Sequence, residues 1–222
     1  MMEKRAKDFR RAAWEDQRGK WGTMALIAFV STLITGACGL LAYIDYYLGI
    51  LGSIALLLIG GALSLGMAFA VLTTARRGEP KVEMLFSGFR RFGASLALYL
   101  LIAVFTFLWT LLLIIPGIIK AYSYSMSYFI LADCPEMPAN QARKQSMALM
   151  QGHKWRLFCL DLSFIGWWLL CILTLGILSF WVLPYQQTAR AKFYQDLIGE
   201  GARPAAPVAQ DKADAQAPKE IQ

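Results

Sequence analysis

Residues 92–119 read FGASLALYLLIAVFTFLWTLLLIIPGII and contain no charged residue. An α-helix crosses the hydrocarbon core of a bilayer with about 20 consecutive apolar residues, so this stretch is long enough to span a membrane. Three further stretches are also free of charge: residues 21–44, 46–75 and 162–189. The sequence therefore predicts an all-α fold, a polytopic bundle of transmembrane helices.

The composition supports the same class of fold. The chain of 222 residues is 57% hydrophobic and 17% charged, whereas soluble domains have about 45–50% apolar and about 25% charged residues. The apolar stretches leave no segment long enough for a large soluble domain. This excludes disulfide scaffolds, nucleic-acid domains with a soluble core and large extramembrane enzyme domains.

Motifs of catalysis are missing from the sequence. It contains no HExxH motif, no GxSxG elbow and no glycine-rich phosphate loop. The acidic residues inside the apolar stretches are single, so no carboxylate pair is available for acid–base chemistry. A single histidine, His153, cannot build a histidine-rich metal site. We therefore predict no catalytic residue, no cofactor and no metal site, and a protein that is not an enzyme.

The start of the chain leaves one alternative open. A basic segment followed by an apolar run is also typical of a signal peptide. The run that starts at Trp21 is longer than the apolar region of a signal peptide, about 7–15 residues, and no clear A-x-A cleavage site follows it. A retained first span is the preferred interpretation.

The basic residues indicate how many spans there are and how they are oriented. All Lys and Arg residues except Lys120 fall within residues 4–20, 76–91, 143–156 and 190–219. Because basic segments stay on the cytoplasmic side, each gap between clusters must contain an even number of crossings. We predict six spans in three hairpins, with both termini cytoplasmic. The spans are about 22–44, 48–74, 93–115, 118–133, 156–174 and 177–197.

The predicted hairpins turn at Asp45, at Pro116-Gly117 and at residues 174–176. The spans 118–133 and 177–197 are polar for membrane helices, so either could instead be a re-entrant or interfacial helix covered by its neighbours. Outside the transmembrane domain, residues 21–197, we expect a cytosolic amphipathic segment at 1–20. Residues 198–222, which cannot bury a core, predict a disordered cytosolic tail.

Each hairpin is preceded by a glycine, basic residues and an aromatic residue. The predicted interface anchors are Lys20 and Trp21, Arg91 and Phe92, and Lys154 and Trp155. In such positions the cation stays among the headgroups and the ring lies at the interface. This recurrence fits a weak threefold repeat, but anchors of this kind are also common at the ends of unrelated spans.

Short amphipathic helices are predicted before the hairpins. The clearest carries Val82, Leu85, Phe86 and Phe89 at i, i+3, i+4 and i+7, which forms one apolar stripe. Residues 1–20, 75–92 and 134–156 each have a net charge of +3. The predicted partners are therefore anionic lipid headgroups at the cytosolic face, each nearby cation contributing about 1 kcal/mol, although the same charges are also explained as the signal that sets the orientation of the spans. Nucleic acid is not a predicted partner, and a protein partner or a homo-oligomer stays open.

Asp161 is the most informative polar residue. It lies six residues beyond Trp155, hence about 9 Å into the membrane at the α-helical rise, where ionisable residues face the protein interior and have a partner. Asp161 and Arg190 are at nearly equal distances from Leu175 along the two arms of a hairpin. We predict an Asp161–Arg190 pair, or a network that includes Gln186 and Gln187. The pair could fix the hairpin or form part of a polar path.

Several strings of residues resemble a known family. They are YFILAD at 128–133, GHKWRLF at 152–158, LDLSFIGW at 160–167, LTLGI at 173–177 and Pro184-Tyr185, with Gly19-Lys20-Trp21 and Ile115-Pro116-Gly117. Through these strings, residues 1–197 resemble the bacterial integral membrane family called domain of unknown function 975. The resemblance implies a multi-pass protein of the bacterial cytoplasmic membrane. It supplies no activity, cofactor or catalytic residue.

Two functions follow as hypotheses. The first is a non-catalytic protein that organises lipids or protein partners at the membrane through its basic cytosolic helices. The second is a small transporter or channel with a polar intramembrane site around Asp161 and Arg190. The second hypothesis requires a polar cavity that reaches this pair, whereas a sealed pair would exclude it.

Overall fold

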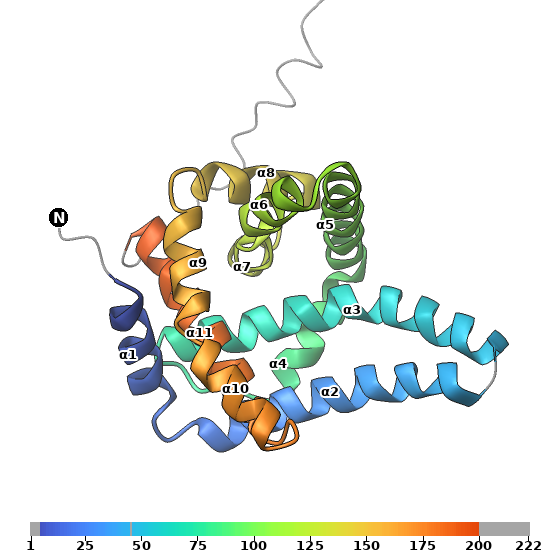
Figure 1. Ribbon diagram of the computed structural model, residues 1–222, viewed down its shortest axis with the longest axis horizontal. Helices are drawn as coiled ribbons and strands as arrows, with labels where there is room; N and C mark the ends of the chain where they lie inside the picture. The colour runs from blue at the N-terminus through green and yellow to red at the C-terminus, as the bar shows by residue number, and fades with distance from the viewer. Residues whose placement is uncertain (1–4, 45, 200–222) are drawn as a thin grey trace, which may run out of the picture.

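The computed structural model describes residues 5–44 and 46–199, and every regular element within these ranges is helical (Figure 1). The elements are α1 (Ala6–Gln17), α2 (Trp21–Ile44), α3 (Tyr46–Ala75), α4 (Glu83–Phe86), the 3-10 helix η1 (Ser87–Arg91), α5 (Phe92–Leu112), α6 (Ile114–Tyr124), α7 (Ser127–Asp133), α8 (Ala139–Leu149), α9 (Lys154–Leu162), α10 (Ile165–Leu173) and α11 (Ser179–Ile198). Asp45, and residues 200–222 of the predicted tail, lie outside the described residues.

Four segments of the described chain are long and apolar enough to cross a membrane. They are Trp21–Leu40, Tyr47–Ala75, Glu83–Leu112 and Lys154–Leu173. The predicted class is thus confirmed as far as an all-helical described chain with four candidate membrane-spanning helices. The predicted spans 118–133 and 177–197 are not among the four. The first is divided between α6 and α7, and α11 carries polar side chains, including Gln186 and Arg190, along its length.

The chain turns between α5 and α6 at Leu113, not at Pro116-Gly117 as the sequence predicted. Leu113 has extended backbone, with φ −160° and ψ 137°. Pro116 lies in the first turn of α6, where a helix does not need the N–H that proline lacks. At Gly117 a Cβ atom would lie 2.4 Å from Oγ1 of Thr110. The glycine thus lets α6 pack closely against α5 directly after the turn.

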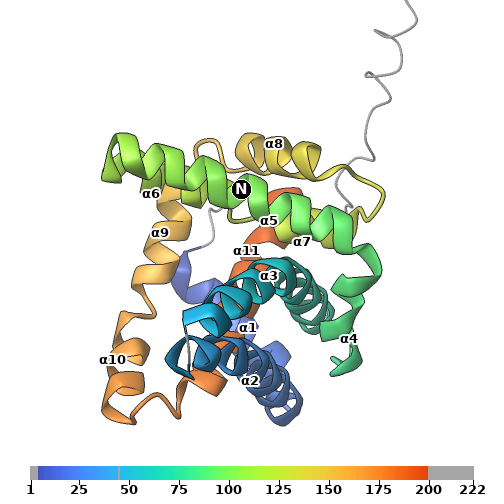
Figure 2. The same cartoon turned by 90° about the vertical axis from the view of Figure 1, so that its right-hand side faces the viewer.

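Two helix pairs extend outward from the middle of the molecule. α2 packs along α3, and α5 packs along α6. The pairs point in different directions (Figures 1 and 2). Large apolar side chains such as Leu33, Leu51, Phe107 and Leu111 are exposed on them, as expected for surfaces that face lipid. The divergence of the two pairs leaves room between them for the cavity described below.

The short elements α4 and η1 lie directly on α3. Two glycines make this close approach possible. A Cβ atom on Gly66 of α3 would lie 1.9 Å from the carbonyl oxygen of Leu85, and one on Gly88 of η1 would lie 1.9 Å from that of Ala62. The apolar stripe predicted at residues 82–89 therefore buries Leu85 against α3, whereas Phe86 and Phe89 stay partly exposed.

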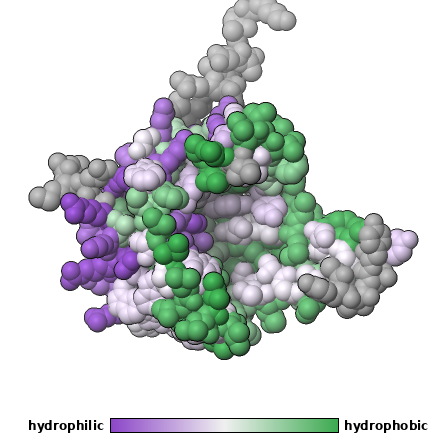
Figure 3. All heavy atoms as spheres, in the orientation of Figure 1, coloured by the Kyte–Doolittle hydropathy of each residue, from purple (hydrophilic) through white to green (hydrophobic). Residues whose placement is uncertain are grey.

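The last helix, α11, lies at the centre of the packing and contacts α1, α2, α3, α9 and α10. Its side chains are buried on more than one side, among them Tyr185, Thr188, Phe193 and Tyr194. Phe193 meets Phe9 of α1 with ring centroids 5.4 Å apart. Figure 3 shows hydrophilic residues gathered on the side of α1, whereas hydrophobic residues cover α10 and the region of α5. On the face shown, the side around α1 is therefore polar, and apolar helices extend away from it.

Candidate functional site

Asp161 of α9 and Arg190 of α11 form a two-pronged ion pair. Nε of Arg190 donates to Oδ1 of Asp161 at 2.9 Å, and Nη2 donates to Oδ2 at 2.8 Å. The side chain of Asp161 is 13% exposed and that of Arg190 is 29% exposed. Because both nitrogens of one edge of the guanidinium are used, the geometry fixes the two helices in register and leaves Nη1 on the opposite side.

The two predicted glutamines have different roles. Gln186 extends the pair, since its Nε2 donates to Oδ1 of Asp161 at 3.0 Å and its Oε1 accepts from the indole of Trp168 at 3.2 Å. Gln187 points elsewhere and lines a cavity together with Arg190. The structure therefore joins Asp161, Arg190 and Gln186 in one network and places Gln187 beside it.

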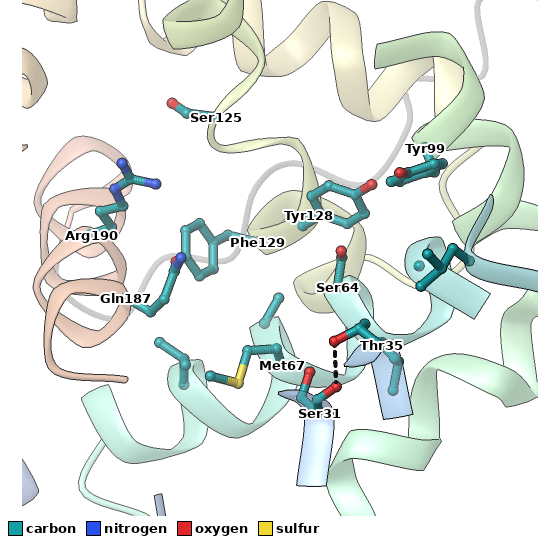
Figure 4. A pocket seen from close by; sticks show the side chains of 15 residues that line it. Ser31, Thr35, Ser64, Met67, Tyr99, Ser125, Tyr128, Phe129, Gln187 and Arg190 are labelled. Carbon is teal, nitrogen blue, oxygen red and sulfur yellow. Dashed lines mark hydrogen bonds between the residues drawn. The ribbon is translucent and has the colours of Figure 1, made fainter. Parts of the chain in front are cut away.

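A cavity of about 560 Å³ lies between α2, α3, α5, α7 and α11 (Figure 4). Its lining carries many hydroxyl groups and one cation, and Asp161 does not take part. The polar lining residues are Ser31, Thr35, Ser64, Tyr99, Ser125, Tyr128, Gln187 and Arg190. The apolar part comes mainly from α3 and includes Leu63 and Met67. The cavity thus combines a hydroxyl-rich surface, an arginine and an apolar wall.

Three of the hydroxyl groups, those of Ser64, Tyr99 and Tyr128, lie at the end of the cavity that is opposite Arg190. In Figure 4 the hydroxyls of Tyr99 and Tyr128 are turned toward one another, with Ser64 close by, while Arg190 and Gln187 project from α11 on the far side of Phe129. Gly60 of α3 faces the ring of Tyr99, and a Cβ atom there would lie 3.5 Å from the ring.

A second recess of about 510 Å³ adjoins this cavity between α5, α6 and α7. Four residues line both spaces: Ser64, Tyr99, Ser125 and Tyr128. Apart from these, the recess is bordered by residues of α5 such as Ile102 and Phe107, together with Thr106 and Thr110. These four hydroxyl-bearing residues therefore lie between a polar space near α11 and a more apolar space along α5.

The basic clusters meet one another through acidic residues. Asp16 of α1 is 7% exposed and accepts from Nε of Arg77 at 3.3 Å, while Nζ of Lys192 lies 2.5 Å from its other oxygen. Lys20 donates to the carbonyl oxygen of Gly78 at 2.8 Å. The ends of α1, α3 and α11 are thereby tied together, although the residues are far apart in sequence.

Asp133 forms a second meeting point at the end of α7. Its Oδ2 accepts from Nη2 of Arg76 at 2.7 Å and from the hydroxyl of Tyr194 at 3.1 Å. The hydrogen bond to Asp133 raises the pKa of the Arg76 guanidinium above its ordinary value, even though partial burial acts in the opposite direction. Arg156 of α9 pairs with Asp196 of α11 at 3.0 Å. Each of the four basic clusters thus contributes a side chain to these contacts.

The predicted interface anchors lie in several environments. Trp155 is 71% exposed and stacks on Phe158, and Phe92 is 37% exposed. Arg91 pairs with Glu136, and Lys154 is half-buried. Lys20 is engaged with Gly78, as described above. The half-buried ring of Trp21 packs against Trp14. Trp155 and Phe92 are therefore the anchors with the most accessible side chains.

Sequence reasoning missed the acidic partners and most of the cavity. Asp16 is one of four acidic residues within residues 1–20, and Asp133 lies between two basic clusters, so the sequence context of neither residue marks it as a partner. Ser31 and Thr35 lie one helical turn apart on α2, where Thr35 donates to the Ser31 carbonyl at 3.0 Å, but nothing in the sequence shows which side of α2 faces α3. In the described residues no group of three or more His, Cys, Asp or Glu side chains is placed to hold a metal ion.

Over the residues that the structure describes, these features define the class of protein: a helical protein with four helices long and apolar enough to span a membrane, and with a hydroxyl-lined cavity between its helices. The family model described as "Protein of unknown function (DUF975)" matches residues 1–123 and 110–200. The chain belongs to this family, as the resemblance of its motifs indicated. No curated protein and no solved structure matches the chain.

Proposed function

We propose that the protein is a non-catalytic protein of the bacterial cytoplasmic membrane that binds and organises lipids, with both termini in the cytosol. The observation that carries this proposal is the cavity between the helix pairs. Its hydroxyl-rich lining and Arg190 suit a polar headgroup, and the apolar wall and exposed apolar helices suit acyl chains. A molecule that needs both environments is an amphiphile.

The orientation is supported by the contacts among the basic clusters. Asp16, Arg77, Asp133 and Lys192 lie in one ion-paired region at the ends of α1, α3, α7 and α11. If this region faces the cytosol, the chain leaves it and returns three times. This supports six crossings in three hairpins, in which α6–α7 and α11 complete the second and third hairpins while covered by neighbouring helices.

Cysteine labelling tests this orientation in a variant whose four native cysteines are replaced by serine. Glu79→Cys and Glu136→Cys should react with a membrane-impermeant maleimide only after the cells are opened, because both positions adjoin the basic region. Leu175→Cys, at a position that is 93% exposed, and Leu113→Cys should react in intact cells. Labelling of Glu79→Cys and Leu175→Cys from the same side of the membrane would contradict the three hairpins.

The ion pairs change how the protein would attract lipids. The sequence suggested three basic surface helices that bind anionic headgroups. Several of those cations have a carboxylate partner within the protein, as Arg76, Arg77 and Arg156 do. A paired charge attracts headgroups more weakly than a free one, so the cavity is the better candidate for a lipid contact that selects one headgroup over another.

Filling the cavity tests lipid binding. Ser64→Phe places a ring at a residue that lines both spaces, and we expect the lipid retained per protein after purification in detergent to fall at least fivefold. Ser53→Phe is the matched control, since Ser53 lies on α3 but is exposed, and it should retain the wild-type amount. The measurement is mass spectrometry of extracted lipid. Equal retention in both variants would contradict the proposal.

Tyr128→Phe is a second test of lipid binding that does not depend on whether the Ser64→Phe variant folds. It removes one hydroxyl from the cavity and adds no bulk, so the fold should be kept. Retained lipid should fall by about twofold to tenfold, as expected for the loss of one hydrogen bond of about 0.5–1.5 kcal/mol. Retention at the wild-type level in Tyr128→Phe would also count against a headgroup in this cavity.

A transporter or channel is the second candidate function, because the cavity reaches Arg190, the partner of Asp161. The two functions differ in what the cavity-filling variant does after reconstitution. Solute flux in liposomes that is lost in Ser64→Phe but kept in Ser53→Phe would favour transport. Lipid retention that depends on Ser64, without measurable flux, would favour the organising function.

A further inference from the structure

A third cavity is lined mainly by aromatic rings. It has a volume of about 350 Å³, and its lining residues are Trp14, Trp21, Trp167, Leu178, Trp181, Val182 and Tyr185. The rings come from α1, α2, α10 and α11, which lie far apart in sequence. No charged side chain takes part in the lining. This cavity is separate from the hydroxyl-rich one, with which it shares no residue.

Tyr185 is the base of the aromatic cavity. It is 5% exposed, and its hydroxyl donates to the carbonyl oxygen of Arg10 at 3.1 Å, which fixes the ring. The ring of Trp14 lies against it with centroids 5.6 Å apart and planes at 77°, and the ring of Trp167 lies at 6.1 Å and 81°. Trp14 and Trp21 meet at 4.9 Å and 62°. Steeply inclined rings form walls on several sides of a space, which stacked rings cannot do.

The walls of this cavity suit a cation. The face of an aromatic ring carries negative electrostatic potential, and several faces around one space are the known means of holding an alkylammonium group. A positively charged side chain in the lining would repel such a ligand, and none is present. The guanidinium of Arg10 does not line the cavity: it donates to the Ser163 carbonyl at 2.8 Å, lies 5.9 Å from the centroid of Phe164 and interacts with the hydroxyl end of Tyr185.

The position of the cavity suits a lipid headgroup. Trp21 is the first residue of the first candidate span, and Trp14 belongs to α1, the polar helix before it. Trp14 and Trp21 thus place one wall of the cavity where the polar helix α1 meets the first apolar helix, and the other walls come from α10 and the start of α11. Trp14 and Trp181 are each 43% exposed, so a group from the surrounding membrane can reach the rim while Tyr185 closes the inner end.

We propose that Trp14, Trp21, Trp167, Trp181 and Tyr185 form a binding site for an alkylammonium headgroup, of which choline is the fully methylated form. The bound group is recognised by its positive charge and its methyl or methylene surface together. The inference goes beyond the lipid-organising function, because the site uses other residues and would hold a cation even if the hydroxyl-rich cavity bound nothing.

Binding is tested with the full-length protein in maltoside detergent, which carries no ammonium group. Phosphocholine and tetramethylammonium are the probes, and 3,3-dimethyl-1-butanol is the neutral molecule of similar shape. Saturation-transfer NMR of the probe methyl protons measures binding. Both cations should bind at least tenfold more tightly than the alcohol. Equal binding of the alcohol would overturn the proposal, because the cavity would then recognise only apolar surface.

Variants assign the binding to these rings. Trp181→Leu should weaken the binding of tetramethylammonium at least tenfold, whereas Trp181→Phe, which keeps a ring, should weaken it less than threefold. Trp181 is partly exposed, so both variants should fold. Trp155→Leu is the matched control, since Trp155 is exposed and lies outside the cavity, and it should bind as the wild type does. An equal loss in Trp155→Leu and Trp181→Leu would overturn the proposal.

Nanodiscs separate a lipid from a free ligand as the source of the ammonium group. If the site takes a headgroup, discs of phosphatidylcholine should block the binding of tetramethylammonium, and discs of phosphatidylglycerol should not. Discs of phosphatidylethanolamine, whose ammonium group carries no methyl groups, should show how much the methyl groups contribute to this competition. Unhindered binding of the probe in all three discs would assign the same site to a soluble alkylammonium ligand. Failure of Ser64→Phe to alter lipid retention leaves these results unaffected, so the two proposals fail separately.

Discussion

Replacing Arg190 with leucine should lower the midpoint of thermal unfolding in detergent by about 6–12 °C. The change leaves the carboxylate of Asp161, 13% exposed, without its two-pronged partner. Removing one member of a buried ion pair costs about 3–5 kcal/mol, and the partial exposure of Arg190 places the loss near the lower value. For a chain of this size each kcal/mol shifts the midpoint by about 2–4 °C. Fluorescence-detected size exclusion after heating gives the midpoint.

The double variant Asp161→Leu with Arg190→Met distinguishes the loss of the ion pair from the cost of leaving one charge without a partner. No charge is left alone in it, and apolar residues of similar volume are often as stable as a buried pair, so we expect at least half of the lost stability to return. Arg11→Leu breaks an ion pair with Glu15 in which the arginine side chain is 84% exposed, and it should cost less than about 1 kcal/mol. An Arg190→Leu protein as stable as Arg11→Leu would refute a stabilising role of the pair.

Adding one methyl group at Gly88 should destabilise the protein strongly. The new Cβ of Gly88→Ala would lie 1.9 Å from the carbonyl oxygen of Ala62 and 3.0 Å from the backbone nitrogen of Gly66. Backbone atoms cannot rotate away as side chains can, so η1 must move off α3. Overpacking of this kind costs about 1–3 kcal/mol and sometimes more. We expect the yield of monodisperse protein in detergent to fall several-fold, with Gly66→Ala behaving alike.

Gly93→Ala is the control for this steric argument. Gly93 lies in α5, and a Cβ atom there would meet nothing within 4 Å. In a helix alanine is favoured over glycine by up to about 1 kcal/mol, so this variant should be as stable as the wild type or slightly more stable. The same chemical change is thus expected to have opposite signs at two positions five residues apart. Similar midpoints for Gly88→Ala and Gly93→Ala would show that η1 does not pack tightly on α3.

The helices of the fold could be predicted from charge-free stretches, but their directions could not. The predicted span at 22–44 corresponds closely to α2, and that at 48–74 to α3, since long apolar runs have few alternatives to a helix. The turn predicted at Pro116-Gly117 is wrong, because proline is also favourable in the first turn of a helix. The divergence of the two helix pairs depends on contacts such as that of Gly66 with α4, which no local pattern reveals.

In the candidate site, too, contacts within one hairpin could be predicted from the sequence, whereas contacts between distant segments could not. The contact between Asp161 and Arg190 follows from equal distances on either side of a turn, and Leu175 and Gly176 do have the positive φ values, 52° and 86°, of a tight reversal. Asp16 instead meets Arg77 and Lys192, which are distant in sequence. The cavity residues Ser64 and Tyr99 come together only because two helix pairs diverge from one region. The hydrophobic periodicity of a sequence describes one helix at a time and carries no information about contacts between distant helices.

The central place of α11 has a consequence for biosynthesis. Helices α1, α2 and α3 leave the ribosome first, yet each of them packs on α11, the last helix of the described residues. Until α11 emerges, Asp16 lacks Lys192 and Asp161 lacks Arg190. The early helices must therefore wait as an open intermediate in which Asp16 has Arg77 but not Lys192 as a partner, and in which Asp161, once α9 is made, has no guanidinium partner. Such an intermediate is what membrane chaperones and quality-control proteases recognise, and a chain that stops before Ser179 should be degraded rather than accumulate.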